Sequence, residues 1–97
     1  MIESFGNGLA KDLFFDKQSK STRSFPADLR RVARRKLLYL HEAAELKDLR
    51  VPPGNKLESL KGPMKGFNSI RINIQWRLVF RWQRGQAFDV QIIDYHK

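Results

Sequence analysis

The chain has 97 residues, 41% of them hydrophobic, and carries 19 lysines and arginines against 10 aspartates and glutamates. That length predicts a single domain over residues 1–97 with a core of its own. The absence of cysteine excludes disulfides and thiol nucleophiles, and with only two histidines it also argues against a structural zinc site. A net charge of +9 favours a polyanionic partner, either nucleic acid or an acidic protein.

The N-terminal sequence MIESFGNGLAKDLFF lacks the basic and apolar regions of a signal peptide. No stretch reaches the roughly 18 apolar residues that a membrane helix needs. We therefore expect a cytoplasmic protein without a membrane partner. Residues 2–5 predict a short strand, residues 9–16 a short helix and residues 17–24 a polar loop.

The clearest helical pattern follows Pro26. Ser24 is the expected N-cap, and Pro26 lies in the first turn, where its missing N–H costs nothing. Apolar residues then recur at three- and four-residue steps as far as Ala44, while the opposite arc carries Arg30, Arg31, Arg34 and Arg35. This arginine face is either a solvated helix surface or a docking face for RNA phosphates or an acidic partner. His41, in the same helix, is interpreted as a surface or packing residue.

The segment after the helix is broken by prolines and glycines. ELKDLR predicts a last turn or a separate short helix, which VPPGN ends. KLESLKGPMKG then predicts a short strand or turn that brings Lys56, Lys61 and Lys65 close together.

Residues 70–82 alternate without a break, with apolar side chains at even positions and mostly polar ones at odd positions. This run is long for one strand, and its polar stretch at 73–75 predicts a hairpin. A three-residue loop keeps one apolar face, because it pairs Ile70 with Leu78 and Arg71 with Arg77. The same parity argument predicts a second three-residue loop over 84–86, pairing Trp82 with Phe88, unless a bulge shifts the register.

The chain ends in IIDYHK, with an acid, a phenol and an imidazole in its last strand. The predicted register places Tyr95 opposite Gln75 and carries His96 to the end of the sheet. Arg71 and Arg77 face each other and repel unless an anion lies between or above them. The terminal residues either join these arginines in an anion site or are outward-facing residues of a frayed strand.

Three motifs in this order, PPGN-LE-L-G, SIRIN-QWR and a terminal DYH, resemble the HigB-type toxins of bacterial toxin–antitoxin pairs, within the RelE-like ribonuclease superfamily. The resemblance begins at SFPADLRRVARRKLLYL and covers most of the chain. It implies a compact α+β domain with N-terminal helices packed on one face of a mostly antiparallel sheet. It also implies a ribosome-dependent mRNA interferase that a HigA-type antitoxin neutralises. A 2:2 toxin–antitoxin complex is expected by analogy, repressing its own promoter by binding operator DNA.

The resemblance carries catalytic roles to the end of the chain. Tyr95 and His96 match the C-terminal catalytic residues of the family, with Asp94 beside them, and Arg77 matches its phosphate-binding arginine. Glu58 stands where some members have a catalytic histidine, and it is either a carboxylate base or a structural acid. The expected RNA-binding residues are Arg71, Asn73, Gln75, Lys56 and Lys61.

Cleavage of RNA without a metal needs a base for the 2′-OH proton, cations for the charge on phosphorus and an acid for the leaving oxygen. Arg77 and Arg71 are the expected phosphate clamps, and the imidazole of His96 is the natural acid or base. No metal or cofactor is expected. The alternatives are a non-catalytic RNA-binding module that regulates translation and a disarmed toxin that acts as co-repressor with its antitoxin. A DNA-binding role is less favoured because the sequence shows no convincing helix-turn-helix.

Overall fold

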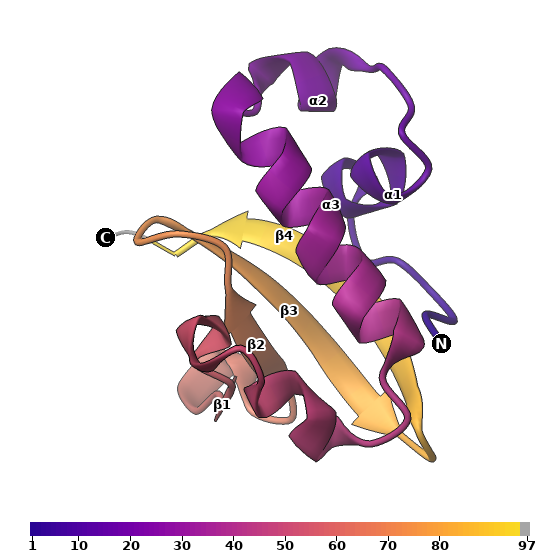
Figure 1. Cartoon of the computed structure of the whole chain (residues 1–97), viewed down its shortest axis with the longest axis vertical. Coiled ribbons are helices and arrows are strands. Elements are labelled where there is room, and N and C mark those ends of the chain that lie inside the picture. Colours follow the sequence, from indigo (N-terminus) through magenta and orange to yellow (C-terminus); the bar gives the residue numbers. More distant parts are fainter. Residues whose placement is uncertain (96–97) are drawn as a thin grey trace.

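The computed structural model describes residues 1–95 and consists of a sheet layer with helices packed on one face (Figure 1). The sheet has strand order β1-β2-β3-β4, and all its named strand pairs are antiparallel. This confirms the α+β class and the placement of the helices. The elements in chain order are α1 Gly8–Phe14, α2 Lys20–Ser24, α3 Ala27–Glu42, the 3-10 turns η1 Leu46–Arg50 and η2 Pro53–Asn55, β1 Glu58–Ser59, η3 Gly62–Met64, β2 Asn68–Arg71, β3 Trp76–Gln83 and β4 Gln86–Asp94.

The polar loop predicted over 17–24 is partly wrong, because α2 forms within it. Ser19 and Thr22 make a capping box, in which each side chain accepts from the backbone N–H of the other residue. Ser24 therefore ends α2 and is not the N-cap of the long helix. Pro26 occupies that position, without a side-chain cap, and α3 ends at Glu42.

The core lies between α3 and the even-numbered face of the sheet. Ala33, Leu37 and Leu40 of α3 are fully buried, as their spacing of three and four residues predicts. They belong to the same buried cluster as Leu78 and Phe80 of β3. In Figure 1, α3 crosses the sheet diagonally, so this helix covers one face and leaves the other face without helices.

Lys36 is a buried cation on α3. Its side-chain Nζ donates a hydrogen bond to Oδ1 of the buried Asn55, whose amide nitrogen donates to the carbonyls of Leu49 (3.1 Å) and Val51 (3.3 Å). Burial, with a smaller contribution from the charge of Arg35, lowers the pKa of Lys36. The asparagine of the PPGN motif thus ties the segment after α3 back to the helix.

The first hairpin follows the predicted register. Ile70 pairs with Leu78 and Arg71 with Arg77, and the N–H of Ile72 donates to the carbonyl of Trp76 at 3.0 Å. The two arginines therefore do lie at directly opposite positions on adjacent strands, as the alternation of apolar residues predicts.

The second hairpin differs from its prediction. Gln83 pairs with Gln86, which leaves a two-residue turn of Arg84 (φ 51°) and Gly85 (φ 76°) in place of a three-residue loop. Trp82 consequently pairs with Ala87 and not with Phe88.

A bulge in β4 restores the predicted register further along this hairpin. The pairing shifts between Val79 and Arg81, opposite Asp89, whose backbone has a φ of 53°. Beyond this point Leu78 pairs with Ile92, as predicted. The positions opposite the end of β4 are therefore the expected ones.

Residues 2–5, predicted as a short strand, form only two isolated parallel bridges to β4, from Ile2 to Ala87 and from Phe5 to Val90. The N–H of Ile2 donates to Nδ1 of His41 at 3.1 Å, and the imidazole lies 5.2 Å from the ring of Phe14. His41 is therefore a packing residue, as expected. Within residues 1–95, no helix is long and apolar enough to cross a membrane.

Candidate active site

The odd-numbered residues of β3 face away from the helices, and Arg77 is the most enclosed charge among them. Its side chain is only 15% exposed. One guanidinium nitrogen lies 3.5 Å from a carboxylate oxygen of Glu58 on β1, and the guanidinium carbon lies 5.0 Å from the centre of the Tyr95 ring. The sheet thus brings together three of the predicted site residues from β1, β3 and the end of β4.

The hydrogen-bonding capacity of Arg77 is not used up by these contacts. Its Nε has no hydrogen-bond partner among the described residues, and its Nη1 makes only the ion pair with Glu58 at 3.5 Å, which is not a hydrogen bond. Enclosed polar groups without hydrogen bonds are rare in folded proteins and often mark a functional group. A guanidinium with unused, pre-oriented N–H groups suits the planar oxygens of a phosphate.

Arg71 strengthens the positive charge of this face. It lies directly opposite Arg77, is half-buried, and makes no ion pair within 4 Å in the described part of the chain. Glu58 is the only carboxylate within ion-pair distance of either arginine in residues 1–95. Two adjacent guanidiniums against one carboxylate leave an excess positive charge that an anion would balance.

The last described residues are held in the sheet. The N–H of Tyr95 donates to the carbonyl of Gln75 at 2.6 Å, and Nε2 of Gln75 donates to a carboxylate oxygen of Asp94 at 3.0 Å. Tyr95 and Asp94 therefore lie opposite Gln75 and Trp76, as the register predicts. The chain is not frayed as far as Tyr95, and the predicted role of His96 falls outside the described residues.

Asn73 has a structural task in the first hairpin. Its side-chain oxygen accepts from the backbone N–H groups of Gln75 (2.9 Å) and Trp76 (2.7 Å), which closes the turn. Because the side-chain oxygen is used within the turn, only the side-chain amide N–H groups of Asn73 can serve as donors to a ligand. This turn also fixes the position of Gln75, whose backbone N–H is one of the two donors.

The predicted lysines lie apart from Arg77. Lys56 is exposed, in the left-handed conformation (φ 46°), at the end of η2. Lys61 is exposed and lines a groove of about 640 Å³ together with Lys65 and Phe67. Within residues 1–95, neither predicted lysine makes a side-chain ion pair.

Sequence analysis missed one pair on the same face of the sheet. The guanidinium carbon of Arg81 lies 4.3 Å from the centre of the Phe67 ring, and its Nε lies 3.3 Å from Oδ2 of Asp89. The alternation of apolar and polar residues over 70–82 could have predicted this pair, because it places Arg71, Arg77 and Arg81 on one face of the sheet. Extending the first hairpin by one pair beyond Asn68–Phe80 also sets Phe67 opposite Arg81.

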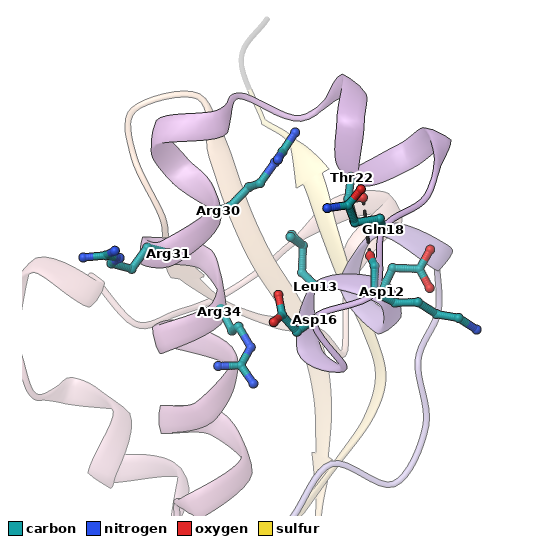
Figure 2. A pocket seen from close by; sticks show the side chains of 9 residues that line it. Asp12, Leu13, Asp16, Gln18, Thr22, Arg30, Arg31 and Arg34 are labelled. Carbon is teal, nitrogen blue, oxygen red and sulfur yellow. Dashed lines mark hydrogen bonds between the residues drawn. The ribbon is translucent and has the colours of Figure 1, made fainter.

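A second charged groove, of about 410 Å³, lies in the helical layer between α1, α2 and α3 (Figure 2). Arg30, Arg31 and Arg34 line it from α3, and Asp12 and Asp16 line it from α1 and the residues after it. Figure 2 shows Arg34 and Asp16 on facing walls, while Arg31 points away from α1. The buried Nε of Arg30 has no hydrogen-bond partner among the described residues. Three of the four arginines thus line a groove, although Arg31, Arg34 and Arg35 are exposed.

The residues that the structure describes contain no cluster of three or more His, Cys, Asp or Glu side chains placed to hold a metal ion. The groups gathered around Arg77 are a carboxylate, a phenol, a carboxamide and guanidiniums. Such a set can bind a phosphodiester and offers a carboxylate for proton transfer.

Comparison with known families gives a match over almost the whole chain. A family model described as the RelE-like toxin HigB of type II toxin–antitoxin systems matches residues 3–96. The toxin HigB-1 of Vibrio cholerae is 42% identical over 83 residues, which are 86% of each chain. An endoribonuclease HigB of Proteus vulgaris is 39% identical over 41 residues, covering 42% of this chain and 45% of that protein.

Solved structures share the fold at low sequence identity. YafQ from E. coli has a TM-score of 0.58 and 16% identity, over 98% of this chain and 92% of that one. A YoeB/ParE toxin from Agrobacterium tumefaciens has a TM-score of 0.54 and 20% identity, over 98% of both chains. The arrangement of helices and sheet described above is therefore the one that these toxins have.

Proposed function

The chain belongs to the HigB-like family of RelE-like toxins of type II toxin–antitoxin systems, and we propose that it is an endoribonuclease that cleaves mRNA on the translating ribosome. The observation that carries this proposal is Arg77, enclosed between Glu58 and Tyr95 and opposite Arg71, with an excess of guanidinium charge over the one carboxylate beside it. The name of the Proteus vulgaris relative, endoribonuclease HigB, supports the same activity.

In the proposed reaction the 2′-oxygen attacks the adjacent phosphorus and the bond to the 5′-oxygen breaks. Arg77 and Arg71 bind the non-bridging oxygens and stabilise the charge that develops there. Glu58, beside Arg77, takes the 2′-OH proton, and His96 protonates the leaving oxygen. Tyr95 orients the RNA by stacking or hydrogen bonding, and Asp94 and Gln75 hold the strand end that carries it.

These side chains fill every role, so the proposal requires no metal and no cofactor on the protein. A phosphorothioate at the cleaved bond tests this point. We expect slowed cleavage in Mg²⁺ that a thiophilic ion such as Mn²⁺ or Cd²⁺ does not restore, because no metal contacts the substituted oxygen.

We propose dependence on the ribosome because the site offers few contacts that could orient a flexible RNA by themselves. Orientation contributes much of the rate when the reacting groups are otherwise weak, and a bound mRNA segment would supply it. The exposed Lys56 and Lys61 would meet ribosomal or messenger RNA phosphates through their charge. This activity places the protein in the cytoplasm.

The test is a cleavage assay with purified protein and a defined mRNA, alone and on programmed ribosomes, in which new 5′ ends are mapped. We expect cleavage on ribosomes, little on free mRNA, and loss of both in His96→Ala. Binding of the protein to RNA or ribosomes without any new 5′ ends would contradict the proposal and favour a non-catalytic RNA-binding module.

A type II toxin has a protein antitoxin, and we propose that this partner is a HigA-type protein in a 2:2 complex that also binds operator DNA. Arginines of α3 outnumber the aspartates that line the groove between α1, α2 and α3, so we propose that acidic side chains of such a partner bind there. Arg30→Ala is expected to weaken the purified complex about tenfold, whereas the exposed Arg23→Ala on α2 is not. Equal antitoxin affinities of Arg30→Ala and Arg23→Ala would exclude this groove as the antitoxin-binding surface. The stoichiometry of the complex is tested separately by native mass spectrometry.

A further inference from the structure

The groove beside β1 and β2 differs in chemistry from the groove in the helical layer. Its walls include Leu60 and Phe67, two glycines, and the lysines Lys61 and Lys65, and no carboxylate lines it. An apolar hollow with cationic side chains suits a ligand that is both flat and anionic. The absence of acidic residues argues against a basic or mixed-charge peptide as the ligand.

Phe67 is fixed as a wall of this groove. Arg81 covers the ring at 4.3 Å, and Asp89 holds Arg81 by an ion pair of 3.3 Å. Gly66 adopts a φ of +94°, and a Cβ there would approach a guanidinium nitrogen of Arg81 to 3.2 Å. The backbone thus passes close to the guanidinium, which keeps Arg81 on the ring and leaves the ring in a defined orientation.

The groove lies beside the strand that carries Glu58. Ser59, which lines it, follows Glu58, the partner of Arg77. Arg81 lies four residues after Arg77 on the same face of β3, so about 13 Å separates the two positions along the strand. An extended RNA chain bound at Arg77 could therefore reach the groove with a neighbouring nucleotide.

One wall also offers a group that can recognise a base edge. The side-chain oxygen of Asn68 accepts a hydrogen bond from the hydroxyl of Ser59 at 3.2 Å. This bond orients the carboxamide, so the N–H groups of Asn68 are available as donors to a base acceptor. Stacking on an aromatic ring such as Phe67 is a contact by which proteins hold unpaired bases. Asn68 follows Phe67 and pairs with Phe80, so its carboxamide lies on the other face of the strand and would meet a different part of the RNA.

We propose that this groove is a second nucleotide subsite, in which an unpaired base of the RNA stacks on Phe67 while Lys61 and Lys65 bind its flanking phosphates. The subsite deepens the proposed function, since it holds the substrate next to the cleaved bond. Arg81 is a positioning residue that acts through Phe67.

The test measures binding of a short, fluorescently labelled single-stranded RNA at low salt, with a series in which each nucleotide in turn is abasic. Phe67→Leu is expected to weaken binding about fivefold or more, because it removes the stacking surface. Removing the base at one position of the RNA is expected to lower its affinity for the wild type by a similar factor. The same abasic RNA should bind Phe67→Leu as tightly as the intact RNA does, because that variant has already lost the stacking contact. Phe67→Tyr keeps an aromatic ring and should bind as the wild type does.

Phe15→Leu is the matched control, because Phe15 is 60% exposed on the helical side of the molecule. It should bind RNA like the wild type. Lys65→Met should reduce the slope of log affinity against log salt by about one, as expected for the loss of one phosphate contact, whereas Lys11→Met, at an exposed lysine of α1, should not.

The outcomes separate this proposal from the proposed function. Cleavage on ribosomes together with unchanged RNA binding in Phe67→Leu would overturn the subsite and leave the nuclease intact. No cleavage, together with the predicted abasic pattern, would leave the subsite standing in a protein that only binds RNA. No measurable RNA binding by the wild type, or loss of antitoxin binding alone in Phe67→Leu, would overturn the subsite.

Discussion

Glu58 is the residue whose role the sequence leaves most open, and its position now favours a catalytic one. It is 51% exposed, so it can reach a substrate, whereas its partner Arg77, 3.5 Å away, is only 15% exposed. The Glu58 carboxylate lies beside the proposed phosphate-binding group, where a base for the 2′-OH is needed. Glu58 is thus well placed for proton transfer.

We therefore predict that Glu58→Gln lowers the cleavage rate at least about 100-fold, because the amide cannot accept the 2′-OH proton. The free energy of unfolding should fall by no more than about 2 kcal/mol, because the glutamine oxygen can still accept a hydrogen bond from the enclosed Arg77. Single-turnover cleavage on ribosomes and urea denaturation measure the two quantities. A cleavage rate within a few-fold of the wild type would show that Glu58 is only a structural acid.

Asn55 represents the opposite case, a polar residue that serves the fold. It is fully buried and joins Lys36 of α3 to two carbonyls in the segment before it. Asn55→Ala is expected to lower the free energy of unfolding by about 3 kcal/mol, since it leaves a buried ammonium and two carbonyls without partners. Denaturant unfolding checks this, with the exposed Gln83→Ala as control, expected to change by less than about 0.5 kcal/mol.

The pKa of Lys36 also makes a pH dependence predictable. Burial lowers this pKa below the ordinary 10.5, so between the lowered value and 10.5 the unfolded chain binds more protons than the native state. The free energy of unfolding contributed by Lys36 therefore rises as the pH increases through this window. Lys36→Met should lose that increase, and an identical pH profile in the variant would contradict the assignment.

At the scale of elements, the β3–β4 hairpin shows what a parity argument can predict. Parity requires an odd number of inserted residues if one face is to stay apolar, and a three-residue loop satisfies this most simply. The structure instead has a two-residue turn and one extra residue at the bulge around Asp89. Both solutions give the same register beyond the bulge, so the position of Tyr95 was predictable although the turn was not.

The turn itself is open to test at Gly85. Its φ is +76°, and a Cβ there would lie 3.4 Å from the carbonyl of Ala44. Gly85→Ala is expected to lower the free energy of unfolding by about 1–2 kcal/mol, because only glycine adopts this conformation freely. Gly54→Ala is the matched control, as a Cβ at that site meets nothing within 4 Å. Equal unfolding midpoints for the two variants would contradict the two-residue turn.

The candidate site was only partly predictable for a similar reason. The Arg71–Arg77 pair follows from alternation within one hairpin, which is a local rule. The contacts of Glu58 with Arg77 and of Phe67 with Arg81 depend on how irregular turns return the chain to the sheet edge. Helix α2 was missed because its cap uses Thr22, whereas the usual capping-box signal is a glutamate or glutamine at that position.

At the scale of the whole molecule, the charge of +9 is divided between two layers. On the face of the sheet away from the helices, Arg71 and Arg77 lie opposite each other with one carboxylate within reach. In the helical layer, arginines of α3 share their groove with Asp12 and Asp16. The sheet face therefore suits a polyanion, and the helical groove suits a protein partner with charged groups, as expected if RNA and the antitoxin bind to different layers.

The central claim is that RNA chemistry occurs at Arg77, and a charge-conserving substitution tests it most directly. Single-turnover mRNA cleavage on programmed ribosomes should be compared between Arg77→Lys and Arg23→Lys, an exposed position on α2. We predict a loss of about 100-fold for Arg77→Lys, because lysine keeps the charge but cannot reproduce the forked donors, and no change for Arg23→Lys. Equal rates for the two variants would contradict the claim and move the chemistry away from this face of the sheet.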